Sequence, residues 1–228
     1  MSALRQMIVW LNDPLNWTNP DGILTRLGEH LRLSAAAVLL ACAVAWPLGV
    51  LLARRDTGGA LVVLASNATQ AIPVIALLTI LPLTVVGFGA PPVILALAVF
   101  AAPSLLASAY TGVREVDADV RESAVGMGLS GKQLLWRVEV PLAVPYLAAG
   151  LRTAAVQVIA TAGLAALVNG GGLGEIVAAG FGLTIAAGGG QILAGGLLIA
   201  GLAVAAELVL AGVQRLVTPA GLRARVTR

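Results

Sequence analysis

The chain has 228 residues, of which 59% are hydrophobic and only 11% charged, and its mean hydropathy is +0.95. Soluble domains carry about 25% charged residues, so this composition excludes an ordinary water-soluble domain and indicates a chain that buries its apolar surface in lipid. A net charge of +3 is too small to suggest a nucleic-acid partner. The single cysteine, Cys42, excludes a disulfide framework within one chain.

Five apolar segments reach the roughly 20 residues that a helix needs to cross a membrane. We therefore predict an all-α, polytopic membrane protein with about five transmembrane helices. The predicted spans are 31–53, 60–86, 93–112, 146–168 and 192–213. They divide the chain into an N-terminal extracytoplasmic or interfacial segment (1–30), a transmembrane domain (31–214) and a cytoplasmic tail (215–228).

The N-terminal segment allows two interpretations. Trp10 and Trp17 lie among polar residues, which is typical of a segment at the membrane interface; a loosely ordered tail is the alternative. The lone histidine, His30, follows Glu29 at the start of the first span, and we expect it to be interfacial rather than catalytic. The predicted spans hold no cluster of metal-ligating side chains and no Ser/His/Asp arrangement, so the sequence predicts neither a metal site nor a catalytic site.

Pro73 interrupts the second apolar segment. Proline lacks a backbone donor and clashes with the carbonyl four residues earlier, here that of Thr69, so a helix breaks or bends at this point. A carbonyl freed inside lipid needs a partner, and the segment is therefore expected to face protein or a water-filled cavity. Polar side chains before this break and on one face of the fourth span either line a translocation path or form helix–helix hydrogen bonds: Asn67, Thr69, Gln70, Gln157 and Thr161.

Residues 113–141 form a polar insert in this apolar chain. The insert contains nine charged residues: Arg114, Glu115, Asp117, Asp119, Arg121, Glu122, Lys132, Arg137 and Glu139. The run from Asp119 to Glu122 fits a capping box with Asp119 as the N-cap, although Asp117 could cap one turn earlier. The helix that follows is predicted to end at Gly128.

A second helix is predicted to begin at Gly131 and to stop before Pro141.

The run from Gly126 to Lys132 has the glycine and lysine spacing of a phosphate-binding P-loop. That motif also requires Ser or Thr after the lysine and a strand before the loop. Gln133 occupies the Ser/Thr position and a helix precedes the run, so the sequence does not predict nucleotide binding by this chain.

The insert also carries a spaced motif: Glu122-Ser123-Ala124, three residues, Gly128, nine residues, then Val138-Glu139-Val140-Pro141. This frame resembles the cytoplasmic "EAA" loop of ABC-transporter permeases, with Ser123 in place of Ala, Val138 in place of Ile and Val140 in place of Leu. The resemblance implies that the loop docks on a separate ATPase. It also implies that the chain is not an enzyme and that ATP and magnesium bind to the partner, with no cofactor in this chain. The implied coupling residues are Asp119, Arg121, Glu122, Ser123, Ala124, Gly128 and Pro141.

Further segments resemble the osmoprotectant branch of these permeases, which imports glycine betaine, carnitine, choline and proline: 70–78, 150–154, 161–167 and 171–174. Importers of methionine and other amino acids have similar frames, and an ion-coupled secondary transporter is a more distant alternative with Glu207 as thin support. The resemblance implies import, a second permease copy or paralogue, two ATPase subunits and an extracytoplasmic binding protein. The binding protein is expected to select the solute, because the four tryptophans are scattered along the chain and predict no aromatic cage.

Basic residues predict the orientation in the cell membrane. With five spans, one side would carry ten basic residues: Arg54, Arg55, Arg114, Arg121, Lys132, Arg137, Arg215, Arg223, Arg225 and Arg228. The other side would carry Arg5, Arg26 and Arg32. The side rich in Lys and Arg is cytoplasmic. The N-terminus is therefore predicted outside, and the polar insert and the C-terminus inside, where an ATPase could reach them.

Two charged residues fall inside predicted spans, where an isolated charge at mid-membrane costs roughly 2.5–3.5 kcal/mol or more. Arg152 and Glu207 lie toward the cytoplasmic ends of the fourth and fifth spans. We predict that they pair there and fix the register of the two helices. The alternative is that Arg152 extends alone to the interface while Glu207 pairs elsewhere or is protonated.

Overall fold

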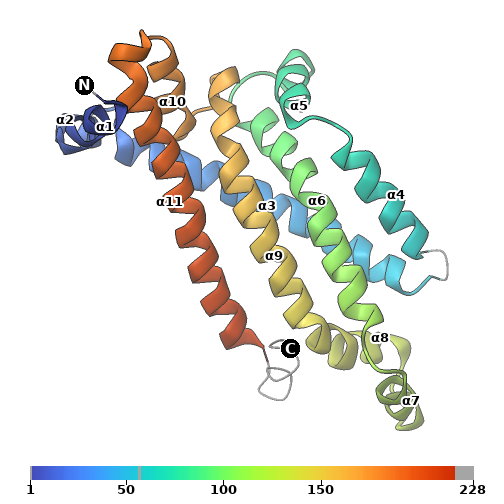
Figure 1. The fold of residues 1–228 in the computed structure, drawn as a ribbon. Coiled ribbons are helices and arrows are strands. Elements are labelled where there is room, and N and C mark those ends of the chain that lie inside the picture. The colour runs from blue at the N-terminus through green and yellow to red at the C-terminus, as the bar shows by residue number, and fades with distance from the viewer. Residues whose placement is uncertain (1, 56–57, 219–228) are drawn as a thin grey trace.

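The computed structural model describes residues 2–55 and 58–218, and every regular element in these residues is a helix (Figure 1). In chain order the α-helices are α1 (Ala3–Asn12), α2 (Leu15–Thr18), α3 (Ile23–Ala53), α4 (Gly58–Gln70), α5 (Val74–Ile80), α6 (Ala90–Arg114), α7 (Ala118–Gly126), α8 (Gly131–Leu134), α9 (Val140–Ala162), α10 (Gly174–Phe181) and α11 (Ile185–Val217). Two 3₁₀-helices, η1 (Leu81–Leu83) and η3 (Gly163–Val168), and one π-helix, η2 (Leu135–Glu139), complete the order. The predicted all-α fold is confirmed.

Four helical stretches are long and apolar enough to cross a membrane: Leu15–Ala53, Ala90–Arg114, Gly131–Val168 and Ala187–Val217. A fifth candidate span is the pair Gly58–Thr69 and Val74–Leu83, whose two helices meet at an angle of 69°. The structure therefore agrees with the predicted number of spans when the bent pair is taken as one. Most of the predicted tail, residues 219–228, lies outside the described residues.

The bend between α4 and α5 falls at Pro73, as predicted. The carbonyl of Thr69 accepts a hydrogen bond from the N–H of Ile72 at 3.2 Å. The partner that a freed carbonyl needs in lipid is thus supplied by the turn itself.

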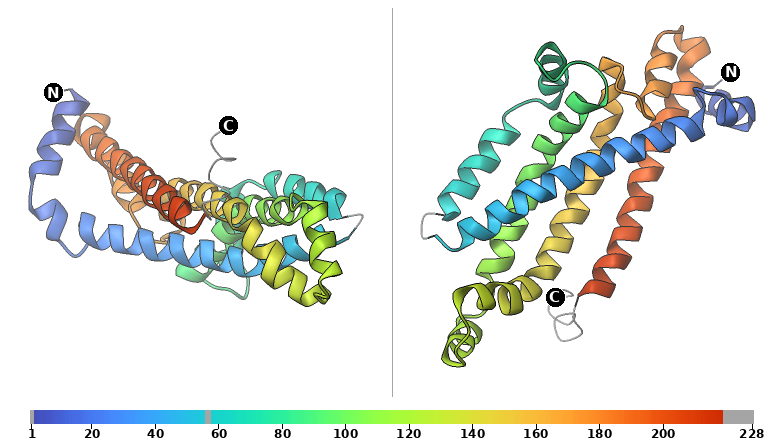
Figure 2. Two further views of the ribbon diagram at one scale, coloured as in Figure 1. Left: turned by 90° about the horizontal axis from the view of Figure 1, so that it is seen from below. Right: turned by 180° about the vertical axis from the view of Figure 1, so that it is seen from behind.

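Small residues let the central helices approach closely. α3 packs on α6, α6 on α9 and α9 on α11, and α3 crosses this row obliquely on one side (Figures 1 and 2). A side chain at Gly49 would place its Cβ 2.7 Å from the Cβ of Ala109, and one at Gly150 would place it 2.1 Å from the Oγ of Ser108. Both crossings therefore require glycine, as is common between transmembrane helices.

The N-terminal segment is ordered, which excludes the interpretation as a loose tail. α1 packs against α11. Trp10 and Trp17 both contact a buried cluster of Ile23, Leu173 and Ile176. The sequence interpretation of four scattered tryptophans is therefore corrected for this pair, which the fold brings to one cluster.

Two long helices begin earlier than predicted, α3 at Ile23 and α11 at Ile185. The run Gly188–Gly190, which falls between the predicted spans 146–168 and 192–213, lies in α11 because its lack of side chains permits close packing. A Cβ at the first of these glycines would lie 2.1 Å from the carbonyl O of Gly180 in α10. α10 is itself a helix that the sequence did not predict. It forms a hairpin with the start of α11 at the end of the molecule opposite α7, which we call the distal end (Figure 1).

The second helix of the polar insert does not stop before Pro141, which corrects the sequence prediction. α8, η2 and α9 belong to one stretch that runs from Gly131 to Val168. Pro141 is the second residue of α9 and closely follows the π-helical turn η2. Hydrogen bonds in a π-turn reach one residue further back than in an α-helix. The N–H donor that Pro141 lacks is therefore missing at a point where the π-turn has already changed the spacing of the helix hydrogen bonds.

Candidate functional site

The N-cap of α7, the first helix of the predicted coupling loop, is Asp117 rather than Asp119. The side chain of Asp117 accepts a hydrogen bond from the N–H of Asp119 at 2.9 Å. The predicted capping box is corrected, because the residue three positions after the cap is Val120, whose side chain has no acceptor. Asp119 lies in the first turn of the helix, where a negative charge interacts favourably with the helix dipole.

Gly128 ends α7 in a Schellman motif, as the sequence predicts. Its φ is +85°. The N–H of Gly128 donates to the carbonyl of Val125 at 2.8 Å, and the N–H of Leu129 donates to the carbonyl of Ala124 at 3.2 Å. A residue with a Cβ costs roughly 1–2 kcal/mol in this left-handed conformation, so the turn requires glycine.

A capping box that was not predicted from the sequence begins α8. The N–H of Gln133 donates to Oγ of Ser130 at 3.4 Å, and the N–H of Ser130 donates to Oε1 of Gln133 at 2.8 Å. Gln133, whose presence argues against a P-loop, thus has a structural role in starting this helix.

Glu139 is the buried centre of the base of the loop, with an exposed fraction of 4%. Its Oε2 lies 2.7 Å from Nη2 of Arg54 at the end of α3, and its Oε1 lies 3.3 Å from Nε of Arg121 on α7. Arg54 also donates to the carbonyl of Gly131 at 3.1 Å, and Arg121 donates to the carbonyl of Val113. We call Glu139, Arg54 and Arg121 the Glu139 clamp; it joins α3, α7 and η2.

The Glu139 clamp was not predicted from the sequence. In the sequence Arg54 serves only as an orientation signal, and Glu139 occupies a variable position within the motif. One signal could have found it: a lone carboxylate stands between Val138 and Val140. A buried carboxylate is costly unless it is paired and hydrogen-bonded.

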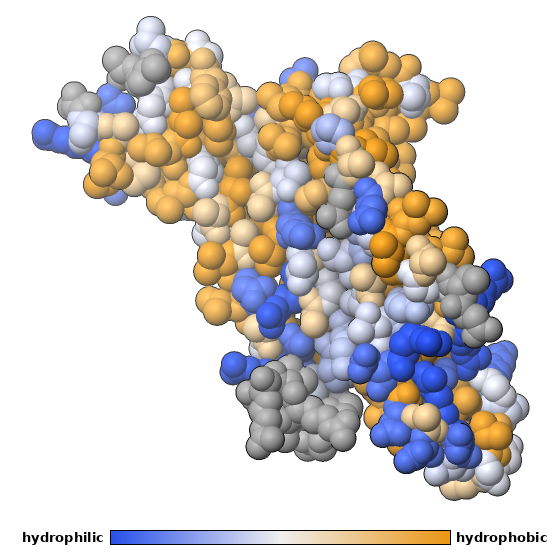
Figure 3. Space-filling view, turned by 45° about the vertical axis from the view of Figure 1, so that its right-hand side comes forward, coloured by the Kyte–Doolittle hydropathy of each residue, from blue (hydrophilic) through white to orange (hydrophobic). Residues whose placement is uncertain are grey.

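The predicted coupling residues of α7 divide into an inward set and an outward set. Ala124 is only 2% exposed and the side chain of Arg121 is 29% exposed, so both mainly contact this chain itself. Glu122 and Ser123 are exposed. Figure 3 shows a mixture of polar and apolar surface at the lower end of the molecule. Four large apolar side chains of the insert are exposed: Val120, Val125, Met127 and Trp136. Such a mixture is typical of a surface that contacts another protein.

The structure brings the two charged residues of the predicted spans together. Nε of Arg152 lies 3.0 Å from Oε1 of Glu207. Nη1 of Arg152 also donates to Oε1 of Gln214 at 2.9 Å, and Nε2 of Gln214 donates to the carbonyl of Pro145 at 3.3 Å. Gln214, which the sequence analysis did not single out, completes a polar network between α9 and α11.

The five predicted path residues lie on two helices: Asn67, Thr69 and Gln70 on α4, and Gln157 and Thr161 on α9. Oγ of Ser104 on α6 donates to Oε1 of Gln157 at 3.1 Å. Oγ1 of Thr69 donates to a carbonyl of its own helix at 2.8 Å, and Asn67 is exposed. Among the described side chains no hydrogen bond joins the two sets. The helices are instead connected through α6, on which both pack.

A glycine-rich loop, residues 169–173, joins η3 to α10 at the distal end. Its backbone passes through the left-handed region, with φ of +53° at Asn169, +82° at Gly171 and +86° at Gly172. Glycine adopts such values without steric cost. The N–H of Gly172 donates to Oε2 of Glu29 on α3 at 2.9 Å. The loop is therefore attached to α3 by a carboxylate that the sequence analysis did not single out.

His30 is a core residue that connects this loop to α9, which corrects its predicted interfacial position. The side chain is fully buried. Nδ1 accepts a hydrogen bond from the N–H of Leu173 at 3.3 Å, and Nε2 lies 2.9 Å from the carbonyl O of Ile159. Because Nδ1 accepts, Nε2 carries the proton and donates to Ile159. The ring is therefore neutral in this arrangement.

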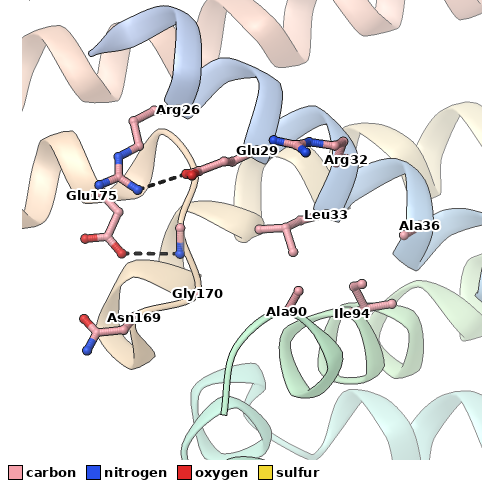
Figure 4. Close-up of a pocket in the computed structure, with 11 residues that line it drawn as sticks. Arg26, Glu29, Arg32, Leu33, Ala36, Ala90, Ile94, Asn169, Gly170 and Glu175 are labelled. Carbon is pink, nitrogen blue, oxygen red and sulfur yellow. Dashed lines mark hydrogen bonds and ion pairs between the residues drawn. The ribbon is translucent and has the colours of Figure 1, made fainter. Parts of the chain in front are cut away.

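A pocket of about 630 Å³ lies beside the glycine-rich loop (Figure 4). Four charged side chains line it: Arg26, Glu29 and Arg32 from α3, and Glu175 from α10. Arg26 forms ion pairs with Asp21 at 2.8 Å and with Glu29 at 2.9 Å. The apolar part of the lining comes from α3 and α6: Leu33, Ala36, Ala90 and Ile94.

The helical fold with four to five candidate membrane spans and the structured polar loop are those of a membrane permease of the ABC-transporter type. A solved structure of the MetNI methionine ABC transporter in an inward-facing conformation has the same fold, with a TM-score of 0.75, 22% sequence identity, and coverage of 91% of this chain and 100% of that chain. The chain belongs to the family of binding-protein-dependent transport system inner membrane components, which matches residues 45–219. Members of this family are transport components rather than enzymes.

Curated relatives are similar over nearly their whole length. The glycine betaine/carnitine/choline transport system permease protein OpuCB of Bacillus subtilis (strain 168) is 36% identical over 96% of this chain and 97% of its own. The carnitine transport permease protein OpuCD of Listeria monocytogenes serotype 1/2a (strain 10403S) is 35% identical over 96% and 95%. The osmoprotectant import permease protein OsmW of Salmonella typhimurium (strain LT2) is 32% identical over 86% and 91%.

Proposed function

We propose that this chain is the permease subunit of an ATP-driven importer of osmoprotectants such as glycine betaine, carnitine or choline. The observation that carries the proposal is that relatives named for these solutes match between 86% and 96% of the chain. Methionine import, the alternative from the same frame, is supported only by a likeness of fold at 22% identity. An ion-coupled mechanism would need acidic groups along a path, and Glu207 is already paired with Arg152.

The polar insert 113–141 is the contact surface for an ATPase subunit, which binds ATP and magnesium. Exposed Glu122 and Ser123 supply polar contacts to that partner. Val125 and Met127, which are 56% and 75% exposed, supply apolar contacts. The capped start of α7 at Asp117–Asp119 and its glycine end hold the helix in one orientation for docking.

The Glu139 clamp transmits movement of α7 into the membrane domain. Arg121 on α7 shares the carboxylate of Glu139 with Arg54 at the end of α3. Pro141, another predicted coupling residue, lies in the first turn of α9, two positions after Glu139. A shift of α7 therefore reaches α3 and α9 through direct contacts between paired charges. Two such permeases, identical or paralogous, work with two ATPase subunits.

The distal end faces the extracytoplasmic side of the cell membrane, where a binding protein delivers the solute. Basic residues at the opposite end, including Arg54, Arg114 and Arg121, support a cytoplasmic position for the insert and the C-terminus. The polar residues of α4 and α9 named above, including Asn67 and Gln157, line the route between the two sides.

Reconstitution into proteoliposomes tests this function. The chain is purified with its ATPase, and uptake of labelled glycine betaine is measured with the binding protein present. Uptake should require hydrolysable ATP and should persist when sodium and proton gradients are collapsed. Uptake driven by an ion gradient without ATP would refute the ABC mechanism. Competition by excess methionine but not by carnitine or choline would refute the osmoprotectant assignment.

A further inference from the structure

The pocket beside the glycine-rich loop contains four charged side chains, and two of them satisfy each other. Nη1 of Arg26 lies 2.9 Å from Oε2 of Glu29, which also accepts the N–H of Gly172 at 2.9 Å. Arg26 forms a second ion pair with Asp21 at 2.8 Å. Arg26, Asp21 and Glu29 are therefore bound to one another in the wall of the pocket, and we do not assign them to a ligand.

The other two charged side chains keep unused bonding capacity. Nε of Arg32 donates to the carbonyl of Gly28 at 3.2 Å, and Arg32 forms no ion pair within residues 2–55 and 58–218. Glu175 accepts one hydrogen bond, from the N–H of Gly171 at 3.3 Å, and likewise forms no ion pair in that part of the chain. The same pocket is therefore lined by one positive and one negative group that have no direct ion-pair partner among the described residues, although Arg32 interacts at longer range with Glu29 and Glu175 with Arg26. A ligand that carries both charges would be complementary to this pair.

The remaining lining favours a methylated cation over a primary ammonium. Leu33, Ala36, Ala90 and Ile94 offer apolar surface in the same pocket. A quaternary ammonium has methyl groups and no N–H donors, so apolar contact leaves no hydrogen bond unmade. A primary ammonium against the same surface would leave donors unsatisfied, which is unfavourable.

The size and chemistry of the pocket also point to weak binding. Its volume of about 630 Å³ exceeds what a small solute fills, and no aromatic side chain is among its lining residues. High-affinity recognition of quaternary ammonium groups uses aromatic cages. Weak binding is what a transit site needs, because a solute on a transport route must be able to leave again.

We propose that this pocket is a low-affinity receiving site for methylated zwitterions. The anionic group of the ligand binds Arg32, its quaternary ammonium lies near Glu175, and its methyl groups contact the apolar lining. The site rests on the proposed function, since a solute released by a binding protein at the distal end would enter here. A phosphatidylcholine headgroup has the same chemistry, with phosphate in place of carboxylate, so the test separates a soluble ligand from a lipid.

The test is direct binding to the full chain, purified without its partners in nanodiscs of phosphatidylglycerol. Ligand-observed NMR follows the methyl signal of glycine betaine during titration in the millimolar range. Arg32→Gln and Glu175→Gln should each raise the Kd about tenfold, which corresponds to about 1.4 kcal/mol. Arg5→Gln, at an exposed site on α1 outside the pocket, is the matched control and should bind like the unmodified chain. Glycine, a primary ammonium zwitterion, should bind about tenfold more weakly than glycine betaine.

Four further measurements keep the result unambiguous. Arg32→Lys keeps the charge and should bind within a few-fold of the unmodified chain; helical circular dichroism checks that every variant is folded. If phosphatidylcholine in the nanodiscs abolishes the glycine betaine signal, the lipid headgroup is the occupant and the zwitterion chemistry stands. No saturable signal, or equal affinity in all variants, overturns the site. ATP-driven uptake by the complete transporter is measured in a separate experiment. A negative binding result would therefore refute this site without refuting the proposed function.

Discussion

Replacing Glu139 with Gln should loosen α7 from the rest of the permease without unfolding the chain. The substitution keeps the shape of the side chain but removes the charge that Arg54 and Arg121 approach at 2.7 Å and 3.3 Å. Removing one partner of a buried ion pair costs about 3–5 kcal/mol. The side chains of Arg54 and Arg121 are 35% and 29% exposed, so hydration of the two guanidinium groups offsets part of this cost. We therefore expect the local opening of α7 to become easier by about 2 kcal/mol.

Hydrogen–deuterium exchange of the α7 amides measures this change. A loss of about 2 kcal/mol lowers protection about 30-fold, because every 1.4 kcal/mol is a factor of about ten. In the complete transporter, ATP hydrolysis should continue while uptake falls, since the clamp no longer transmits the movement of α7.

Glu115→Gln removes the charge of an exposed carboxylate just before α7 and is the control. It should change neither exchange nor uptake. Unchanged α7 protection in Glu139→Gln, with uptake equal to that of the control, would refute the reasoning.

Three other predictions follow from the same structure. Gly128→Ala places a Cβ at a φ of +85°, which should destabilise the end of α7 by about 1–2 kcal/mol and reduce recovery of the ATPase in a pull-down; full recovery would contradict the role of this turn. Arg152→Gln and Glu207→Gln should each reduce Tm or uptake more than the charge-swapped double variant does, whereas a swap as damaging as the sum of the singles would show that the pair contributes nothing. Cysteine at Asn67 or Gln157 should react with a water-soluble thiol reagent in at least one nucleotide state; protection in every state would remove that position from the path.

The features that the sequence predicted correctly depend on the backbone chemistry of one or two residues. Pro73 bends the second span because it lacks a donor, wherever the neighbouring helices lie. Gly128 ends α7 because a left-handed turn favours glycine. Pro141 has the same chemistry as Pro73, yet the helix continues through it. The difference is the π-turn η2 just before Pro141, which changes the hydrogen-bond spacing where the donor of the proline is missing.

The features that the sequence could not predict depend on partners far away in the chain. Glu139 meets Arg54 across 85 positions, and His30 meets Ile159 across 129. No periodicity or spacing connects such residues, so their burial is visible only in the fold. The pairing of Arg152 with Glu207 could be predicted from the sequence because both residues lie in predicted spans, where an unpaired charge is costly. The glycines at 188–190 lie outside the predicted spans because the sequence does not show the close contact of α10 with α11 that places them in a helix.

α3 is attached near its start to the glycine-rich loop and just beyond its end to Glu139, and both of these are expected to change position. Near its start, Glu29 and His30 hold the glycine-rich loop; just beyond its end, Arg54 holds Glu139. The 24 peptide units between His30 and Arg54 span about 36 Å at 1.5 Å per residue. A helix transmits displacement along its axis far better than a chain of loops does. An axial shift of α3 that begins at its Arg54 end would therefore act on the glycine-rich loop without any ligand in between. Pro47 within the helix is the point where bending would reduce that shift.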